Sequence, residues 1–181
     1  MTESGRTRDR DLLERFRGGD CEAFAEIYRA HKRVVSRFAL FMTGDALKAA
    51  EITQDVFVWL IHHPQGFDPA RGALDAFLVG VARKLLKRRH AERHRWVSLT
   101  ESTAGSQLPA DRAEADYLRL RKAIAQLPER YRAVVVLCDL EERSYDEAAA
   151  IVECPVGTIR SRLHRAHAML TRKLVKRGCP A

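Results

Sequence analysis

The stretch Ser144–Leu174, SYDEAAAIVECPVGTIRSRLHRAHAMLTRKL, predicts two helices joined by a tight turn. Ser144 and Glu147 have the spacing of a capping box, which starts the first helix. The apolar run after them stops at Pro155, which cannot continue a helix but suits the opening turn of the next one. This arrangement is typical of a helix-turn-helix, whose second helix enters the major groove of DNA. A helical hairpin with a charged surface is the alternative interpretation.

The second of these helices separates apolar from basic side chains. Its apolar residues recur at steps of three or four, so we expect them to pack inward as one stripe of Ile159, Leu163, Ala166, Leu170 and Leu174. The outward face holds Arg160, Ser161, His164 and Arg165. Between Gly157 and Arg177 there are seven Lys or Arg and no carboxylate. Such a face suits phosphates and base edges, and Thr158 near the helix start is placed for a phosphate.

Composition narrows the class of protein. The chain has 181 residues, is 46% hydrophobic and carries a formal charge of +8, so it can bury a core and favours a polyanionic partner. Nucleic acid and membrane lipid both satisfy that charge. No apolar run approaches membrane-spanning length, and the polar N-terminus has no signal-peptide core. We therefore expect a cytoplasmic protein without membrane insertion.

The cysteines and histidines do not predict a metal site. The four cysteines are widely and irregularly spaced, which favours reduced, mostly buried thiols over a metal knuckle or a disulfide framework. Three histidine pairs occur, but none has a convincing third ligand nearby. We expect neither a metal nor another cofactor.

Helical periodicity runs through the N-terminal half. Asp9–Arg17 predicts a short helix that ends at Gly18-Gly19, and Asp20 then caps a longer helix that reaches about Met42. A further helix, from Asp45 to about His62, has two apolar sides and only a narrow charged strip. Such a helix is either wrapped by its own domain or keeps one side for a partner.

A loop and a second basic helix follow. Pro64–Leu74 is rich in Pro and Gly and carries Phe67 and Arg71. An aromatic ring on a basic loop can stack on an unpaired base, although a Phe folded back as a plug fits the loop equally well. The helix from about Asp75 to Arg95 then contains seven Lys or Arg against one acid in its second half, beginning with Arg83, Lys84, Lys87 and Arg88.

The C-terminal half begins after an acidic segment. Trp96–Asp116 lacks periodicity and is rich in Ser, Thr, Gly and Pro, which predicts a flexible linker. Two helices are expected next, the second through LPERYRAVVVLCDLEE, because helical spacing persists although Val134–Val136 favours a strand by propensity. We therefore expect an all-α chain of two small helical domains, residues 1–95 and 117–181, joined by a linker at residues 96–116.

Taken in order, the motifs resemble the extracytoplasmic-function (ECF) group of bacterial sigma factors in the sigma-70 family. They are FAEIYRAHKRVVSRFALFMTGD, AAEITQDVFVWLI, FDPARGALDAFLVGVAR, LPERYRAVVVL and SYDEAAAIVECPVGTIRSRLHRA, and the resemblance covers about Phe16–Leu174. It implies a protein without an active site of its own that binds core RNA polymerase and directs promoter recognition and transcription initiation. The first domain would recognise and melt the minus-ten element, and the second would read the minus-thirty-five element. An anti-sigma factor is a further expected partner.

The resemblance also assigns residues. Glu51, Gln54 and Asp55 match the family's contact with the polymerase beta-prime clamp. The loop with Phe67 and Arg71 matches the one that captures a flipped base of the non-template strand, and the acidic linker matches the segment that threads the polymerase cleft. For the two promoter elements we expect contacts from Phe67, Arg71, Arg83, Lys84, Lys87 and Arg88 (minus ten) and from Thr158, Arg160, Ser161, His164 and Arg165 (minus thirty-five).

Two points remain open at the level of sequence. Family members often have Asn where this chain has Lys84, which leaves its downstream base preference undecided. The alternative function is a stand-alone helix-turn-helix regulator that binds DNA as a dimer, but such a regulator would not explain the second basic helix, the aromatic loop or the two-sided helix. A metal-dependent nuclease would need clustered carboxylates, and Glu51 and Asp55 have no third partner.

Overall fold

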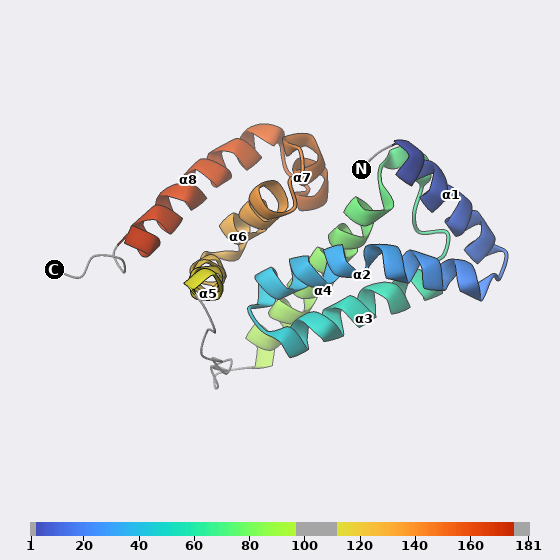
Figure 1. Cartoon of the computed structure of the whole chain (residues 1–181), viewed down its shortest axis with the longest axis horizontal. Coiled ribbons are helices and arrows are strands. Elements are labelled where there is room, and N and C mark those ends of the chain that lie inside the picture. The colour runs from blue at the N-terminus through green and yellow to red at the C-terminus, as the bar shows by residue number, and fades with distance from the viewer. Residues whose placement is uncertain (1–2, 97–111, 176–181) are drawn as a thin grey trace. The chain divides into compact units, whose positions relative to one another are not determined.

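The structure is a computed structural model that describes residues 3–96 and 112–175 (Figure 1). These residues form helices and turns with no strand among them, which confirms the all-α prediction. The chain divides into two compact units, residues 1–39 with 47–98 and residues 40–46 with 99–181. In order, the helices are α1 Glu3–Arg17, α2 Cys21–Thr43, α3 Ala46–His62, η1 Pro69–Arg71, α4 Leu74–Trp96, α5 Arg112–Ala125, α6 Glu129–Val135, η2 Val136–Leu140, α7 Tyr145–Val152 and α8 Val156–Val175.

The core of the first unit is built from one buried stripe of each of its four long helices. Leu13 of α1, Ile27 and Phe38 of α2, Leu60 of α3 and Leu78 of α4 are fully buried. Their spacing within each helix is the periodicity that the sequence displays. The burial of these side chains fixes which face of α3 and of α4 is left for solvent or for a partner.

The turn between α1 and α2 follows the predicted capping pattern. Gly19 has a φ of 93°, which suits glycine, and it ends α1 together with Gly18. Asp20 Oδ1 then accepts hydrogen bonds from the backbone N–H groups of Glu22 and Ala23, at 2.9 and 3.2 Å. The hydrogen bond from Arg15 and these backbone bonds hold the pKa of Asp20 below its usual range.

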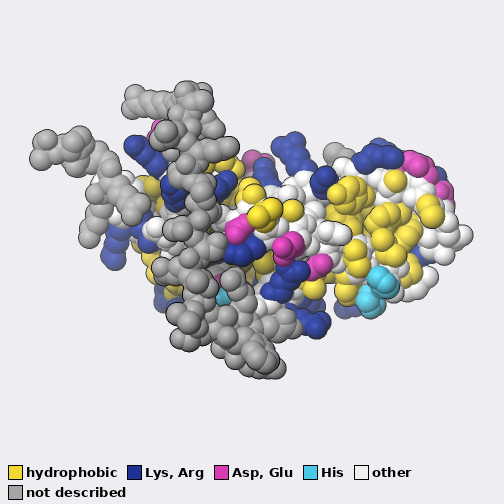
Figure 2. Space-filling view, turned by 90° about the horizontal axis from the view of Figure 1, so that it is seen from below, with side chains coloured by type: hydrophobic (Ala, Val, Ile, Leu, Met, Phe, Trp, Pro, Cys, Tyr) yellow, Lys and Arg dark blue, Asp and Glu magenta, His cyan; other side chains and the backbone are white. Residues whose placement is uncertain are grey.

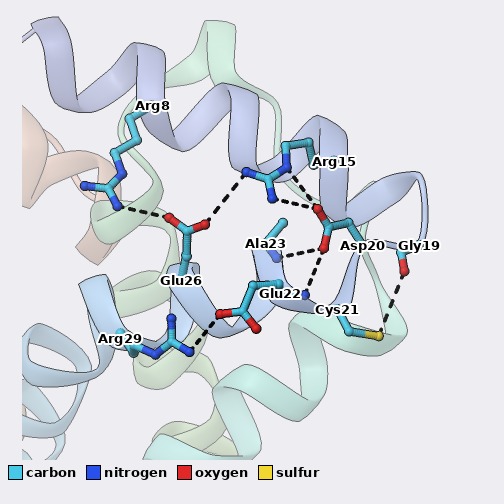
Figure 3. A network of polar contacts seen from close by, with 9 residues as sticks. All are labelled: Arg8, Arg15, Gly19, Asp20, Cys21, Glu22, Ala23, Glu26 and Arg29. Carbon is cyan, nitrogen blue, oxygen red and sulfur yellow. Dashed lines mark hydrogen bonds and ion pairs between the residues drawn. The ribbon is translucent and has the colours of Figure 1, made fainter.

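Charged side chains also join α1 to the first half of α2 (Figure 3). Glu26 accepts from Arg8 at 3.0 Å and lies 3.7 Å from Arg15, while Glu22 pairs with Arg29 at 2.9 Å. These pairs are exposed, so each contributes little free energy. Of these pairs, the two that involve Glu26 join α1 to α2, whereas Glu22 and Arg29 both belong to α2. A buried contact is added by Asp9 and His31, whose Oδ1 and Nε2 atoms lie 3.0 Å apart.

The second unit contains α5 to α8. Val134, Val135 and Val136 are buried and helical, so tertiary packing overrides their strand propensity as predicted. The last turn of this helix widens into the π-helix η2. Arg132 of α6 donates to the carbonyl oxygens of Ala125 and Leu127, which satisfies acceptors at the end of α5.

Two predicted boundaries are wrong. α1 begins at Glu3 rather than Asp9, because its first turns contain no apolar residues whose spacing would mark them as helical in the sequence. Residues 112–116, predicted as linker, lie in α5 for the same reason, since RAEAD favours a helix without an apolar stripe. The remainder of the predicted linker, residues 97–111, lies outside the described residues.

Two predictions of burial also need correction. Leu174 is 40% exposed, so the inward stripe of α8 ends at Leu170. Cys21 is exposed, and both Cys138 and Cys154 are half-buried. The prediction that the thiols are mostly buried in the core is therefore wrong for these three residues. Burial raises the pKa of the Cys138 thiol to about 11, which keeps it protonated at neutral pH.

Candidate nucleic-acid interface

The predicted helix-turn-helix is formed by α7 and α8. The capping box is complete, because Ser144 Oγ accepts from the Glu147 backbone N–H at 3.2 Å and Glu147 Oε2 accepts from the Ser144 backbone N–H at 3.0 Å. Glu153 ends α7 in the left-handed region, with a φ of 58°. Pro155 lies two residues further on, and its carbonyl oxygen accepts hydrogen bonds from the backbone N–H groups of Thr158 and Ile159 in the first turn of α8. Three residues therefore connect α7 to α8.

The two faces of α8 are arranged as its sequence predicts. Ile159, Leu163, Ala166 and Leu170 are buried, whereas Arg160, Ser161, His164 and Arg165 are exposed and Thr158 is half-buried. The Ser161 hydroxyl donates to the Thr158 carbonyl at 3.1 Å within the helix. With five Lys or Arg and no carboxylate between Val156 and Val175, this face is shaped and charged for a DNA groove.

The second basic surface lies on α4. Lys84, Lys87 and Arg88 are exposed and occupy one side of the helix, while Arg83 is half-buried. Arg71 in η1 is also exposed, but it precedes the start of α4. Because a helix rises 1.5 Å per residue, Lys84 lies about 15 Å along the axis from Leu74. The structure therefore spreads the predicted minus-ten residues along the helix and does not gather them in one cluster.

The loop before α4 is held in place by α1. Arg17 donates to the backbone carbonyls of Pro64 and Phe67, at 2.9 and 2.6 Å. The ring of Phe67 is only 5% exposed and packs on Phe77 with 5.1 Å between the ring centroids. This corrects the prediction of an accessible stacking ring, since in this conformation Phe67 is the folded-back plug.

We expect Phe67→Ala to destabilise the protein, because removing a buried aromatic ring leaves a cavity that costs roughly 3–5 kcal/mol. Urea unfolding of the full chain measures this effect. Arg71→Ala, an exposed change in the same loop, should alter the free energy of unfolding by no more than about 0.5 kcal/mol. A Phe67→Ala variant as stable as the parent would contradict the plug.

A cleft beside this loop was missed at the level of sequence. It has a volume of about 880 Å³, and α1 lines one side with Arg6, Arg10 and Arg17 while the loop contributes Asp68. Arg10 also pairs with Glu14 at 3.1 Å. This cleft could not be predicted, because the first two turns of α1 carry no apolar stripe that would mark them as helical.

Two of the three predicted polymerase-binding residues, Glu51 and Gln54, lie on an exposed strip of α3, and the third, Asp55, is half-buried beside it. Leu47, Glu51, Gln54, Val58 and Ile61 recur at steps of three or four, and all five are exposed. Leu47 reaches 78% exposure. The opposite side, which includes Ile52 and Val56, is buried. The domain thus covers α3 on one side only, and apolar side chains remain exposed on the other (Figure 2). This agrees with the interpretation in which α3 keeps one side for a partner.

A groove runs beside this strip between α2 and α3. It has a volume of about 440 Å³ and is lined by aromatic and aliphatic side chains with a few polar ones, including Tyr28, Lys32, Gln54, Phe57, Val58 and Ile61. An apolar groove with a polar rim is typical of a protein-binding surface.

Arg89 is the residue that sequence patterns did not single out. It belongs to the basic stretch of α4, but its guanidinium turns toward α3 and pairs with Glu51 at 3.0 Å and with Asp55 at 2.5 Å. Arg89 is therefore not part of the basic surface of α4. Its side chain holds in place both carboxylates that are predicted to contact the polymerase. No local sequence pattern indicates these two contacts, because Arg89 lies 38 positions from Glu51 and 34 positions from Asp55 in the sequence.

Two further kinds of feature are absent from the described parts of the chain. Within them, no three His, Cys, Asp or Glu side chains are placed to hold a metal ion together. None of their helices is long and apolar enough to span a membrane.

Comparison with known families matches both compact units. Residues 27–96 match the model of sigma-70 region 2, and residues 117–170 match the model of sigma-70 region 4. Together these matches include α3, the loop, α4 and the helix-turn-helix.

Individual relatives agree with these matches. The chain is 32% identical over 145 residues to the ECF RNA polymerase sigma factor SigL of Mycobacterium tuberculosis, which covers 77% of this chain and 82% of SigL. It is 30% identical to SigE of Mycolicibacterium smegmatis over 83% of this chain, but spans only 61% of the length of SigE. It is 27% identical to SigW of Bacillus subtilis, over 90% of this chain and 94% of SigW.

Solved structures support the same fold. The sigma factor RpoE of Bartonella quintana, in complex with the anti-sigma factor NepR, superposes with a TM-score of 0.71 at 24% identity, covering 83% of this chain and 96% of RpoE. CnrH, in complex with the cytosolic domain of CnrY, gives the same TM-score and identity over 95% of this chain and 99% of CnrH.

Proposed function

Because this chain belongs to the ECF group of the sigma-70 family, we propose that it is an RNA polymerase sigma factor that binds core RNA polymerase and directs sequence-specific promoter recognition and transcription initiation. The observation that carries this proposal is the match of sigma-70 regions 2 and 4 to its two halves in that order. Sigma factors are non-enzymatic regulators, so the polymerase performs the chemistry and this chain needs no active site. It acts in the cytoplasm, where transcription takes place.

The first domain, residues 1–95, binds core polymerase through α3. Glu51 and Gln54 supply the polar centre of the exposed strip, with Asp55 beside them, and Leu47, Val58 and Ile61 supply its apolar ends. Arg89 fixes the two carboxylates before the partner arrives, which reduces the conformational entropy lost on binding.

The same domain binds the minus-ten element of the promoter. Arg71 and the α1 arginines flank the loop that receives an unpaired base, and Lys84, Lys87 and Arg88 hold the backbone of the strand as it runs along α4. Lys84 donates to base acceptors but accepts nothing, unlike an Asn, which pairs with adenine through a donor and an acceptor. It therefore favours an acceptor-rich base such as guanine or discriminates weakly.

The second domain, residues 117–181, reads the minus-thirty-five element. Arg160, Ser161, His164 and Arg165 face the base edges, and Thr158 lies at the start of α8, where backbone N–H groups attract a phosphate. The segment between α4 and α5 connects the two domains, and its acidic part follows the polymerase cleft.

An anti-sigma factor is a further proposed partner. Two structurally similar proteins were solved as complexes, one with the anti-sigma factor NepR and one with CnrY. The apolar groove between α2 and α3 gives such an inhibitor a surface on which it would compete with polymerase.

Selection of DNA from a random pool separates a sigma factor from a stand-alone regulator. With core polymerase, this chain should enrich two elements at a fixed spacing, because both domains engage DNA within the holoenzyme. A stand-alone dimeric regulator would instead enrich one symmetric site with the chain alone, since its symmetry is mirrored in the operator. A symmetric site selected without polymerase would overturn the proposal.

A further inference from the structure

The loop before α4 is held from one side by a side chain of α1. Arg17 is half-buried, and its Nε and Nη2 atoms donate to the carbonyl oxygens of Pro64 and Phe67, at 2.9 and 2.6 Å. The donors of a guanidinium form a rigid, planar fork, so one side chain fixes two points of the loop backbone relative to each other. The same two bonds fix the distance of the loop from α1.

The loop is held from a second side by Trp59 of α3. A Cβ atom at Gly66 would lie 2.7 Å from the Trp59 ring and 3.0 Å from the His63 carbonyl oxygen, so a larger residue does not fit there without a shift. The Trp59 ring has little room to move aside, because it is stacked on His63 and packs on Phe77, with 4.5 and 5.7 Å between the ring centroids. The loop conformation therefore requires glycine at position 66.

Directly after these two contacts, the loop forms a closed turn. Asp68 Oδ1 accepts from the Ala70 backbone N–H at 2.9 Å, and the Arg71 backbone N–H donates to the Asp68 carbonyl oxygen at 3.0 Å, which closes η1. All three residues are exposed, and Asp68 and Ala70 line the cleft of about 880 Å³ that α1 borders. The part of the loop that a nucleotide can reach is thus a short turn positioned by residues outside it.

A fixed position matters for capturing an unpaired base. An extruded base has already lost its stacking and pairing in the duplex, so the site that receives it must make up for that loss. A loop that becomes ordered only when the base arrives also loses conformational entropy at that step, whereas a loop that is already held does not. The contacts of Arg17 and Gly66 remove this second cost before DNA binds.

We infer that Arg17 and Gly66 are positioning residues, which hold the loop before α4 in the conformation that captures an unpaired base of the non-template strand. The inference rests on the proposed function of this loop. It gives α1 a part in promoter opening that requires no contact between Arg17 and the base. It also gives the close approach of Gly66 to Trp59 a function beyond packing.

The two contacts differ in chemistry, which supplies matched variants. Arg17→Ala removes both hydrogen bonds, and Arg17→Lys keeps the charge but replaces the fork by a single ammonium group. Gly66→Ala changes no charge and pushes the loop away from Trp59. Arg8→Ala is the control, because it removes the same charge from the same helix, and Arg8 pairs with Glu26 of α2 rather than with the loop.

The probe is an oligonucleotide of the non-template strand that carries the minus-ten sequence selected by the holoenzyme. A set of copies has one abasic nucleotide each, moved along the element. The captured position is the one at which the parent holoenzyme loses most affinity, by roughly tenfold or more if one base is held. The readout is the ratio of affinities for the intact and the abasic oligonucleotide at that position. A variant that is merely less folded loses affinity for both, so its ratio does not change.

We expect Arg17→Ala and Gly66→Ala each to lower this ratio by at least about threefold, because the base must then order the loop itself. Arg17→Lys should lie between the parent and Arg17→Ala. Arg8→Ala should stay within about twofold of the parent, as expected for an exposed change away from the loop.

Three results would overturn the inference in distinguishable ways. An unchanged ratio in Arg17→Ala or in Gly66→Ala removes that residue from base capture and leaves the function of the loop intact. An equal fall of the ratio in Arg8→Ala and Arg17→Ala shows that the loss of charge, and not of the loop contacts, is responsible. If the parent binds intact and abasic oligonucleotides equally at every position, the proposed base capture by the loop fails, and the inference with it.

Discussion

The double substitution Glu51→Lys and Asp55→Lys should weaken binding to core RNA polymerase by at least about a hundredfold, or roughly 3 kcal/mol, because like charges placed across an interface cost several kcal/mol. Glu51 lies on the exposed strip of α3 and Asp55 is half-buried beside it, and both lie between the apolar residues Leu47 and Ile61 of that helix. Affinity can be measured with labelled chain titrated by core enzyme.

The fold should survive this change. The Arg89 pairs that it breaks are partly exposed, and such pairs contribute about 0–1 kcal/mol each. Glu14→Lys with Glu22→Lys is the matched control, because it makes the same change in net charge at two exposed, arginine-paired carboxylates on α1 and α2. Equal polymerase affinity in the α3 variant and the control would remove α3 from the interface.

The second large effect should follow from Arg160→Ala combined with Arg165→Ala. Each base contact contributes roughly 1–3 kcal/mol of discrimination, so the pair should reduce preference for the intact minus-thirty-five element by about thirtyfold or more. The preference is the ratio of holoenzyme affinities for promoters with an intact and with a scrambled upstream element.

Arg172→Ala with Lys173→Ala is the matched control for this effect. It removes the same charge from the same helix, about 18 Å further along its axis from Arg160. The control should weaken binding to both promoters alike, as expected for a loss of general attraction to phosphate. A preference that survives in the Arg160 and Arg165 variant would show that another surface reads the element.

Features that depend on local chain chemistry were predictable from the sequence. The capping box at Ser144, the stop at Gly18-Gly19 and the buried stripe of α8 through Leu170 each follow from residues within a few positions of one another. The strand propensity of Val134–Val136 could be overruled for the same reason, because helical spacing extends on both sides of it.

Features that depend on distant residues were not predictable. Whether Phe67 faces solvent or core is decided by Phe77 and by the Arg17 side chain that anchors the loop from α1, 50 residues away. The orientation of Arg89 is decided in the same way by α3. The contact between the Tyr145 ring and Arg160 likewise joins α7 to α8, so the sequence of α8 alone identifies its basic face but not the neighbours of that face.

The central claim is that this chain gives core RNA polymerase a promoter specificity that the core lacks. The most direct test is to sequence the 5′ ends of transcripts made in vitro on genomic DNA by core enzyme, with and without the chain. We predict a new set of start sites that appears only with the chain and shares two upstream elements at a constant spacing. An identical set of start sites in both reactions would contradict the assignment.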